Sequence, residues 1–102
     1  MSHSSMMTCI GVDPGASGGI AWIRHDGTAG AATMPDTEEG VWEMVKGLRQ
    51  WGPAMGVVEK VGGYIQGNPA PGSAMFNFGM GYGVVRMAMI WLEIPFREAT
   101  PQ

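Results

Sequence analysis

Residues 8–24 read TCIGVDPGASGGIAWIR, a segment that predicts two strands and the turn between them. The β-branched run at residues 8–12 stops at Asp-Pro-Gly, which is typical of a buried strand that ends in a turn. Residues 19–24 predict the second strand, and the Asp-Gly pair within residues 25–27 favours the positive φ of a tight hairpin. We therefore expect the chain to open with antiparallel strands joined by short turns.

Further along the chain, residues 28–34 are rich in Ala and Gly and predict a weak third strand at or near a sheet edge. Asp36 stands three residues before Glu39 and resembles the cap of a capping box. Apolar residues then recur at helical spacing, which predicts a helix that ends near Trp51, where Gly-Pro follows. Residues 55–58 predict a fourth strand.

The remainder of the chain predicts a loop, a helix and a strand. Residues 61–72 are rich in Gly and Pro and predict a long loop, after which Ser73 is expected to cap a helix that runs to about Glu93. Residues 94–100 predict the last strand. The order is β-β-β-α-β-α-β in one domain over residues 1–102, an α/β fold whose mixed sheet is flanked by helices.

Composition excludes several classes of function. The 102 residues are 45% apolar and 15% charged, which suits one small folded domain rather than a disordered segment. The net charge of −3 and the isoelectric point near 5.1 disfavour binding to nucleic acid by charge alone. One cysteine excludes an intrachain disulfide framework, and the first residues lack the pattern of a signal peptide, so we expect a cytoplasmic protein.

The longest apolar tract, residues 74–92, has to be weighed as a membrane span. It contains Asn77 and Arg86, and a charged residue near the centre of a bilayer costs about 3 kcal/mol. We therefore expect a buried helix here and no membrane partner.

Two carboxylates stand at predicted strand ends. Asp13 follows the first strand, and the fourth strand leads directly into Glu59. If the two strands are parallel neighbours, both carboxylates emerge at the edge of the sheet where α/β proteins bind ligands, and their oxygens suit Mg²⁺. The alternative is that Asp13 is an ordinary turn residue and that Glu59 is a solvated strand exit.

Residues 13–19, DPGASGG, could be mistaken for a phosphate-binding loop. The segment lacks the Gly-Lys-Ser/Thr ending of a P-loop and leads into a strand, so no helix N-terminus awaits a phosphate. A strand-turn-strand phosphate loop of the actin and sugar-kinase type stays open, with nucleotide at residues 15–19. Little else favours it, and we expect no nucleotide cofactor.

A resemblance to a known family rests on several ordered blocks: IGVDPGASGG at residues 10–19, VEKV at 58–61, SAMFNFGMGYG at 73–83, IPF at 94–96 and ATPQ at 99–102. Together they resemble RuvC-type Holliday junction resolvases of the phage and prophage branch. That family has the ribonuclease H-like fold, and the resemblance covers nearly the whole chain in the element order derived above.

The resemblance implies a homodimeric nuclease of DNA recombination and repair that hydrolyses phosphodiester bonds in branched DNA, the four-way junction, with Mg²⁺ or Mn²⁺. Asp13 and Glu59 match the first two of the family's four acidic metal ligands and catalytic residues. The other two come from a helix after the last strand, and the sequence reaches Gln102 without it. Glu98 is the remaining late carboxylate near the sheet and is expected to face solvent.

With half of the ligand set missing, the chain is expected to be C-terminally incomplete and its cleavage of DNA much reduced or absent, because two metals stabilise both oxygens of a phosphoryl displacement. The alternative function is a non-catalytic remnant of a resolvase that dimerises or binds branched DNA. Acidic charge and the missing carboxylates favour that alternative.

Further residues are candidates for contacts. Lys60 and Arg86 are expected to bind DNA phosphates, and Tyr64 to stack on an unpaired base, although each could be an ordinary surface residue. The second helix has almost no polar face, so its outer side is expected to pack on a second copy of the chain. The dimer-interface candidates on that helix are Phe76, Gly79, Gly83 and Met87. The two glycines could instead pack on the sheet of their own subunit.

Overall fold

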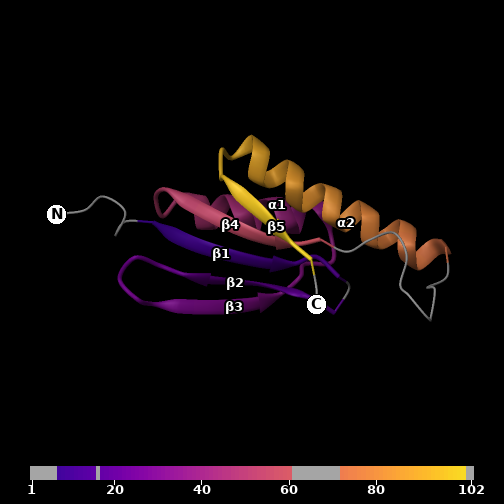
Figure 1. Cartoon of the computed structure of the whole chain (residues 1–102), viewed down its shortest axis with the longest axis horizontal. Coiled ribbons are helices and arrows are strands. Elements are labelled where there is room, and N and C mark those ends of the chain that lie inside the picture. The colour runs from indigo at the N-terminus through magenta and orange to yellow at the C-terminus, as the bar shows by residue number, and fades with distance from the viewer. Residues whose placement is uncertain (1–6, 16, 61–71, 101–102) are drawn as a thin grey trace.

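The computed structural model describes residues 7–15, 17–60 and 72–100, with side chains from residue 81 onward in the last range. Five strands and two helices follow in the predicted order: β1 (Thr8–Asp13), β2 (Gly19–Ile23), β3 (Ala29–Thr33), α1 (Glu38–Arg49), β4 (Ala54–Glu59), α2 (Gly72–Trp91) and β5 (Phe96–Ala99). Figure 1 shows both helices on the same face of one sheet, and the first turns of α2 extend past the end of that sheet.

The strands form one mixed sheet in the order β3-β2-β1-β4-β5. β1 pairs antiparallel with β2, and β2 with β3, as a meander, whereas β4 lies parallel to both β1 and β5. The expected α/β fold is therefore confirmed, and the Ala- and Gly-rich β3 lies at a sheet edge as predicted. Gly27 has a φ of 89°, the positive value expected in the hairpin between β2 and β3.

The core lies between the sheet and the two helices. Along β1 the side chains of Thr8, Ile10 and Val12 are buried, whereas the intervening residues are exposed, because successive side chains of a strand point to opposite faces. The apolar faces of the helices complete the core with Val41, Val45 and Leu48 from α1 and Val85, Ala88 and Met89 from α2.

None of the residues that the structure describes covers the second face of the sheet. Ile23, Met55 and Val57 point outward on it and keep 57%, 43% and 46% of their surface exposed. No helix among the described residues packs on these side chains, since both helices lie on the other face.

Both predicted helix caps are wrong. Thr37, not Asp36, is the N-cap of α1: its backbone is extended and its hydroxyl oxygen accepts a hydrogen bond from the N–H of Gly40 at 3.0 Å. Glu39 is thereby one position too early for a capping box. α2 begins at Gly72, so Ser73 lies inside the helix rather than before it.

The end of α2 also comes earlier than the predicted Glu93. Glu93 has a φ of 57°, and the N–H groups of Glu93 and Ile94 bond back to the carbonyls of Ile90 and Met89 at 3.1 and 2.8 Å. This is a Schellman cap, which turns the chain toward β5. Within the described residues, no helix has the combination of length and apolar character that a bilayer crossing requires.

Candidate active site

Asp13 is the last residue of β1 and is held by the turn that follows it. Its carboxylate Oδ1 accepts a hydrogen bond from the N–H of Gly15 at 3.1 Å, and the N–H of Gly18 closes the turn on the carbonyl of Gly15 at 2.9 Å. A Cβ on Gly18 would lie 2.0 Å from the carbonyl oxygen of Asp13. Glycine is thus required at residue 18 if Asp13 is to keep its place.

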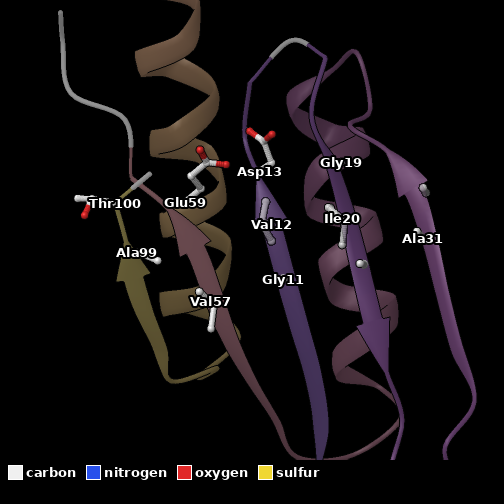
Figure 2. A pocket seen from close by; sticks show the side chains of 12 residues that line it. Gly11, Val12, Asp13, Gly19, Ile20, Ala31, Val57, Glu59, Ala99 and Thr100 are labelled. Carbon is white, nitrogen blue, oxygen red and sulfur yellow. The ribbon is translucent and has the colours of Figure 1, made fainter. Parts of the chain in front are cut away.

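Glu59 is the last residue of β4, the parallel neighbour of β1. The register pairs Val12 with Val58, so the two carboxylate residues follow at equivalent positions on adjacent strands. Asp13 and Glu59 line the same hollow, and Figure 2 shows both carboxylates at the C-terminal ends of their strands. This is the arrangement that the two strand ends predicted.

The hollow has a volume of about 550 Å³ and is open to solvent. Its floor is the uncovered face of the sheet, where small residues from four of the strands leave room: Gly11, Gly19, Ala21, Ala31 and Ala99. Val57 adds a larger apolar side chain to that floor. The carboxylates therefore lie at one end of this hollow, whose floor is apolar and which has room for a covering element or a ligand.

The donor set fits part of a divalent-cation site. Carboxylate oxygens are the ligands that hard cations such as Mg²⁺ prefer, and two of them converge here from rigid strand ends. Within the described part of the chain, the Glu59 side chain makes no hydrogen bond or ion pair. One carboxylate oxygen of Asp13 accepts a hydrogen bond from the N–H of Gly15. Among those same residues, no group of three His, Cys, Asp or Glu side chains could hold a metal ion.

The predicted DNA-binding residues have different surroundings. Lys60 is exposed directly after Glu59, and its backbone N–H donates to the carbonyl of Ala99 at 2.7 Å. Arg86 is ion-paired: its Nε lies 3.2 Å from Oε1 of Glu98. Glu98 thereby compensates the positive charge of Arg86, which a contact with a DNA phosphate would require. Tyr64 lies outside the described residues.

Two of the dimer-interface candidates, Gly83 and Met87, lie on the outer side of α2. Gly83 is exposed, with no described atom within 4 Å of the position a Cβ would take, and Met87 is 52% exposed. Ile90 and Trp91 continue this face at 55% and 69% exposure, and the interface candidates did not include them although their helical spacing placed them there. The side chains of Phe76 and Gly79 are outside the described set.

A contact between α2 and β5 was also missed. The hydroxyl of Tyr82 donates a hydrogen bond to Oε2 of Glu98. Glu98 lies at the surface, as expected, but both of its carboxylate oxygens have protein partners. No local sequence signal joins two residues that are 16 positions apart.

The arrangement of strands and helices is similar to that of known proteins. It superimposes on the RuvC of Thermus thermophilus in complex with a Holliday junction substrate, with a TM-score of 0.62 and 16% identity over 93% of this chain. The chain has the RuvC fold. A second T. thermophilus RuvC structure matches with a TM-score of 0.55, 18% identity and the same 93% coverage.

The described strands and helices account for part of that RuvC fold. The chain spans 65% and 64% of the lengths of the two RuvC structures. The sequence matches no protein-family model and no curated protein. At this level of identity the likeness to RuvC concerns the fold.

Proposed function

We propose that this chain is the nuclease domain of a RuvC-like Holliday junction resolvase of the phage and prophage type, acting in the cytoplasm on branched DNA. The observation that carries the proposal is the placement of Asp13 and Glu59 at the ends of adjacent parallel strands, over one hollow of a RuvC fold. The T. thermophilus RuvC with this fold was solved with a Holliday junction substrate.

In this proposal Asp13 and Glu59 bind Mg²⁺ or Mn²⁺. A divalent cation held by these two carboxylates would stabilise negative charge on the scissile phosphate and would lower the pKa of water bound to it. Asp13 is kept in place by the Gly15 N–H and the close turn at Gly18. Lys60, exposed one residue after Glu59, binds a neighbouring phosphate, and Tyr64 stacks on an unpaired base.

Two carboxylates hold a hydrated Mg²⁺ weakly, because this ion gives up its water reluctantly. We therefore expect slow cleavage by these residues alone. We propose that further carboxylates reach the site from the open side of the hollow. The helices already occupy the opposite face of the sheet, so that side is covered.

The test is nicking of a labelled four-way junction in Mg²⁺ and in Mn²⁺, with Asp13→Asn beside the unaltered chain. The matched control is Asp36→Asn, which removes an exposed carboxylate that lies ahead of α1. We expect slow, metal-dependent nicking that is lost in Asp13→Asn and kept in Asp36→Asn. Equal nicking by both variants would contradict the assignment of Asp13.

The second candidate is a non-catalytic domain that binds branched DNA or dimerises. It is favoured by the net charge of −3 and by the two-carboxylate ligand set of the described residues. Binding of four-way junction over linear duplex by folded protein, without nicking, would select this candidate. If the folded protein does not nick the four-way junction and does not bind it in preference to linear duplex, both candidate functions are contradicted.

We also propose that the exposed face of α2, formed by Gly83, Met87, Ile90 and Trp91, packs on a second copy of the chain. Apolar residues at i, i+4, i+7 and i+8 form a stripe suited to helix packing, and Gly83 permits close approach of backbones. Sedimentation of the unaltered chain and of Trp91→Lys tests this, with Ile23→Lys on the opposite surface as the control. A monomer at micromolar concentration would contradict the dimer.

A further inference from the structure

Tyr82, Arg86 and Glu98 form a cluster that joins α2 to β5. The Tyr82 hydroxyl donates to Oε2 of Glu98, and Nε of Arg86 lies 3.2 Å from Oε1. The guanidinium of Arg86 also lies 5.7 Å from the centre of the Tyr82 ring. Tyr82 and Arg86 are one helical turn apart on α2, so both side chains bind the Glu98 carboxylate from the same side.

The strand that this cluster holds sets the backbone position of Glu59. The pairing of β1 with β4 ends at Val12 and Val58, whereas the pairing of β4 with β5 continues to Glu59 and Ala99. The next bond, from the N–H of Lys60 to the carbonyl of Ala99, is 2.7 Å long. The backbone of Glu59 is therefore paired with β5, one residue beyond the last pair between β4 and β1.

β5 has few other attachments. It is a four-residue strand at the sheet edge, and apart from the side chain of Glu98 only Phe96 among its residues is partly buried. A short edge strand with so little burial frays easily. The anchoring of Glu98 by α2 opposes that fraying one residue before Ala99.

The same turn of α2 also lies against the other carboxylate-bearing strand end. Gly81, adjacent to Tyr82, comes so close to the residue after Asp13 that a Cβ would be 3.4 Å from the carbonyl oxygen of Pro14. One helical turn thus contacts the turn after Asp13 and holds the strand beside Glu59.

We propose that Tyr82, Arg86 and Glu98 are positioning residues, which hold β5 in register and thereby hold the Glu59 carboxylate where it faces Asp13. The inference rests on the proposed function, because it supposes that Glu59 binds a metal ion. It assigns no contact with DNA or metal to the three residues themselves.

The test measures two properties of the full chain in Tyr82→Phe and Glu98→Gln: the affinity for Mn²⁺ alone, from the paramagnetic signal of the free ion, and amide hydrogen exchange of Lys60 without metal. We expect both variants to weaken Mn²⁺ binding by about tenfold, the lower end of what loss of a supporting contact around a ligand causes. Exchange at Lys60 should accelerate while the midpoint of thermal unfolding stays nearly unchanged.

Thr28→Val is the matched control. It removes another hydroxyl donor to a carboxylate, since the Thr28 hydroxyl lies 2.7 Å from Oδ1 of Asp26 in the hairpin between β2 and β3. Mn²⁺ affinity and Lys60 exchange should both stay as in the unaltered chain.

Unchanged Lys60 exchange in both variants would overturn the inference, whatever the metal affinity. Loss of Mn²⁺ binding in Asp13→Asn, with no change in Tyr82→Phe and Glu98→Gln, would also overturn it and leave the proposed metal site standing. If the unaltered chain and Asp13→Asn bind Mn²⁺ equally, the proposed function fails, while faster exchange at Lys60 would still support the role of the cluster in aligning Glu59.

Discussion

Gly18 lies against the backbone of Asp13 so closely that a Cβ would sit 2.0 Å from the Asp13 carbonyl oxygen and 2.8 Å from its Cγ. The turn after β1 thus closes directly on the residue proposed to bind metal. Because no side chain fits there, the position of Asp13 and the identity of residue 18 are coupled.

Gly18→Ala should therefore force the turn to shift and lower the free energy of unfolding by about 3 kcal/mol. The control is Gly11→Ala on β1, where no described atom beyond its chain neighbours lies within 4 Å of the added methyl group. Alanine there should leave stability unchanged or raise it by about 0.5 kcal/mol, because glycine is unfavourable inside a strand. Urea unfolding measures both, and equal effects of the two substitutions would refute the coupling.

Thr37→Ala removes the hydroxyl that caps α1 and should cost about 1 kcal/mol of stability. Asp36→Ala changes the neighbouring residue, which makes no cap, and should stay within about 0.5 kcal/mol of the unaltered chain. Chemical denaturation of the pair distinguishes the observed cap from the one that the sequence pattern favoured. A larger loss in Asp36→Ala would reverse the assignment.

Glu93→Gly should stabilise the chain by about 1 kcal/mol, because Glu93 has a φ of 57° and a side chain is unfavourable in that conformation. Glu43→Gly, at an exposed position inside α1, should instead destabilise by about 1 kcal/mol. Thermal unfolding of both variants should give shifts of opposite sign. A decrease in both would show that the left-handed conformation at residue 93 is not strained.

Met89 and Met87 are two residues apart on α2, yet Met89 is fully buried and Met87 is 52% exposed. Met89→Ala should lower the free energy of unfolding by about 3 kcal/mol because it leaves a cavity between α2 and β4. Met87→Ala should change the stability of the monomer by less than about 0.5 kcal/mol. Equilibrium unfolding at low protein concentration separates these effects from any change in dimerisation.

Tyr82 should titrate above the ordinary pKa of a tyrosine. The hydrogen bond that Tyr82 donates to Glu98 raises its pKa, with smaller contributions from desolvation and from the negative charge of Glu98. Because the pKa is raised in the folded state, this contact stabilises the fold below the pKa of an unfolded tyrosine, and the stabilisation is lost as pH rises through the pKa of the folded state. Tyrosinate absorbance in a Tyr64→Phe background, where Tyr82 is the one remaining tyrosine of the sequence, measures this pKa.

Glu98→Gln in the same background should lower the pKa of Tyr82 toward the ordinary tyrosine value, because the negatively charged acceptor is gone. Asp26→Asn, a change of the same kind in the hairpin between β2 and β3, should leave the pKa of Tyr82 unaffected. An ordinary tyrosine pKa for Tyr82 with Glu98 in place would contradict the Tyr82–Glu98 hydrogen bond in solution.

Much of the fold followed from local patterns. The alternation of buried and exposed residues on β1, the helical spacing in α1 and the Asp-Gly hairpin are each properties of a short segment, so the sequence was enough to predict them. The element order and the positions of Asp13 and Glu59 at strand ends are of the same kind. The cap predicted for α1 was wrong because the neighbouring residues Asp36 and Thr37 are both good N-caps, and a shift of one residue in the start of the helix decides between them.

What depends on contacts between distant segments could only come from the tertiary structure. The sequence specifies that Glu59 ends a strand. Its pairing with Ala99 of β5 and the hydrogen bond from Tyr82 to Glu98 form only when β4, α2 and β5 pack together. The same holds for the bare face of the sheet over which both carboxylates stand, since both helices occupy the other face. Side-chain periodicity determines which face of each element is apolar, whereas packing determines which apolar faces meet.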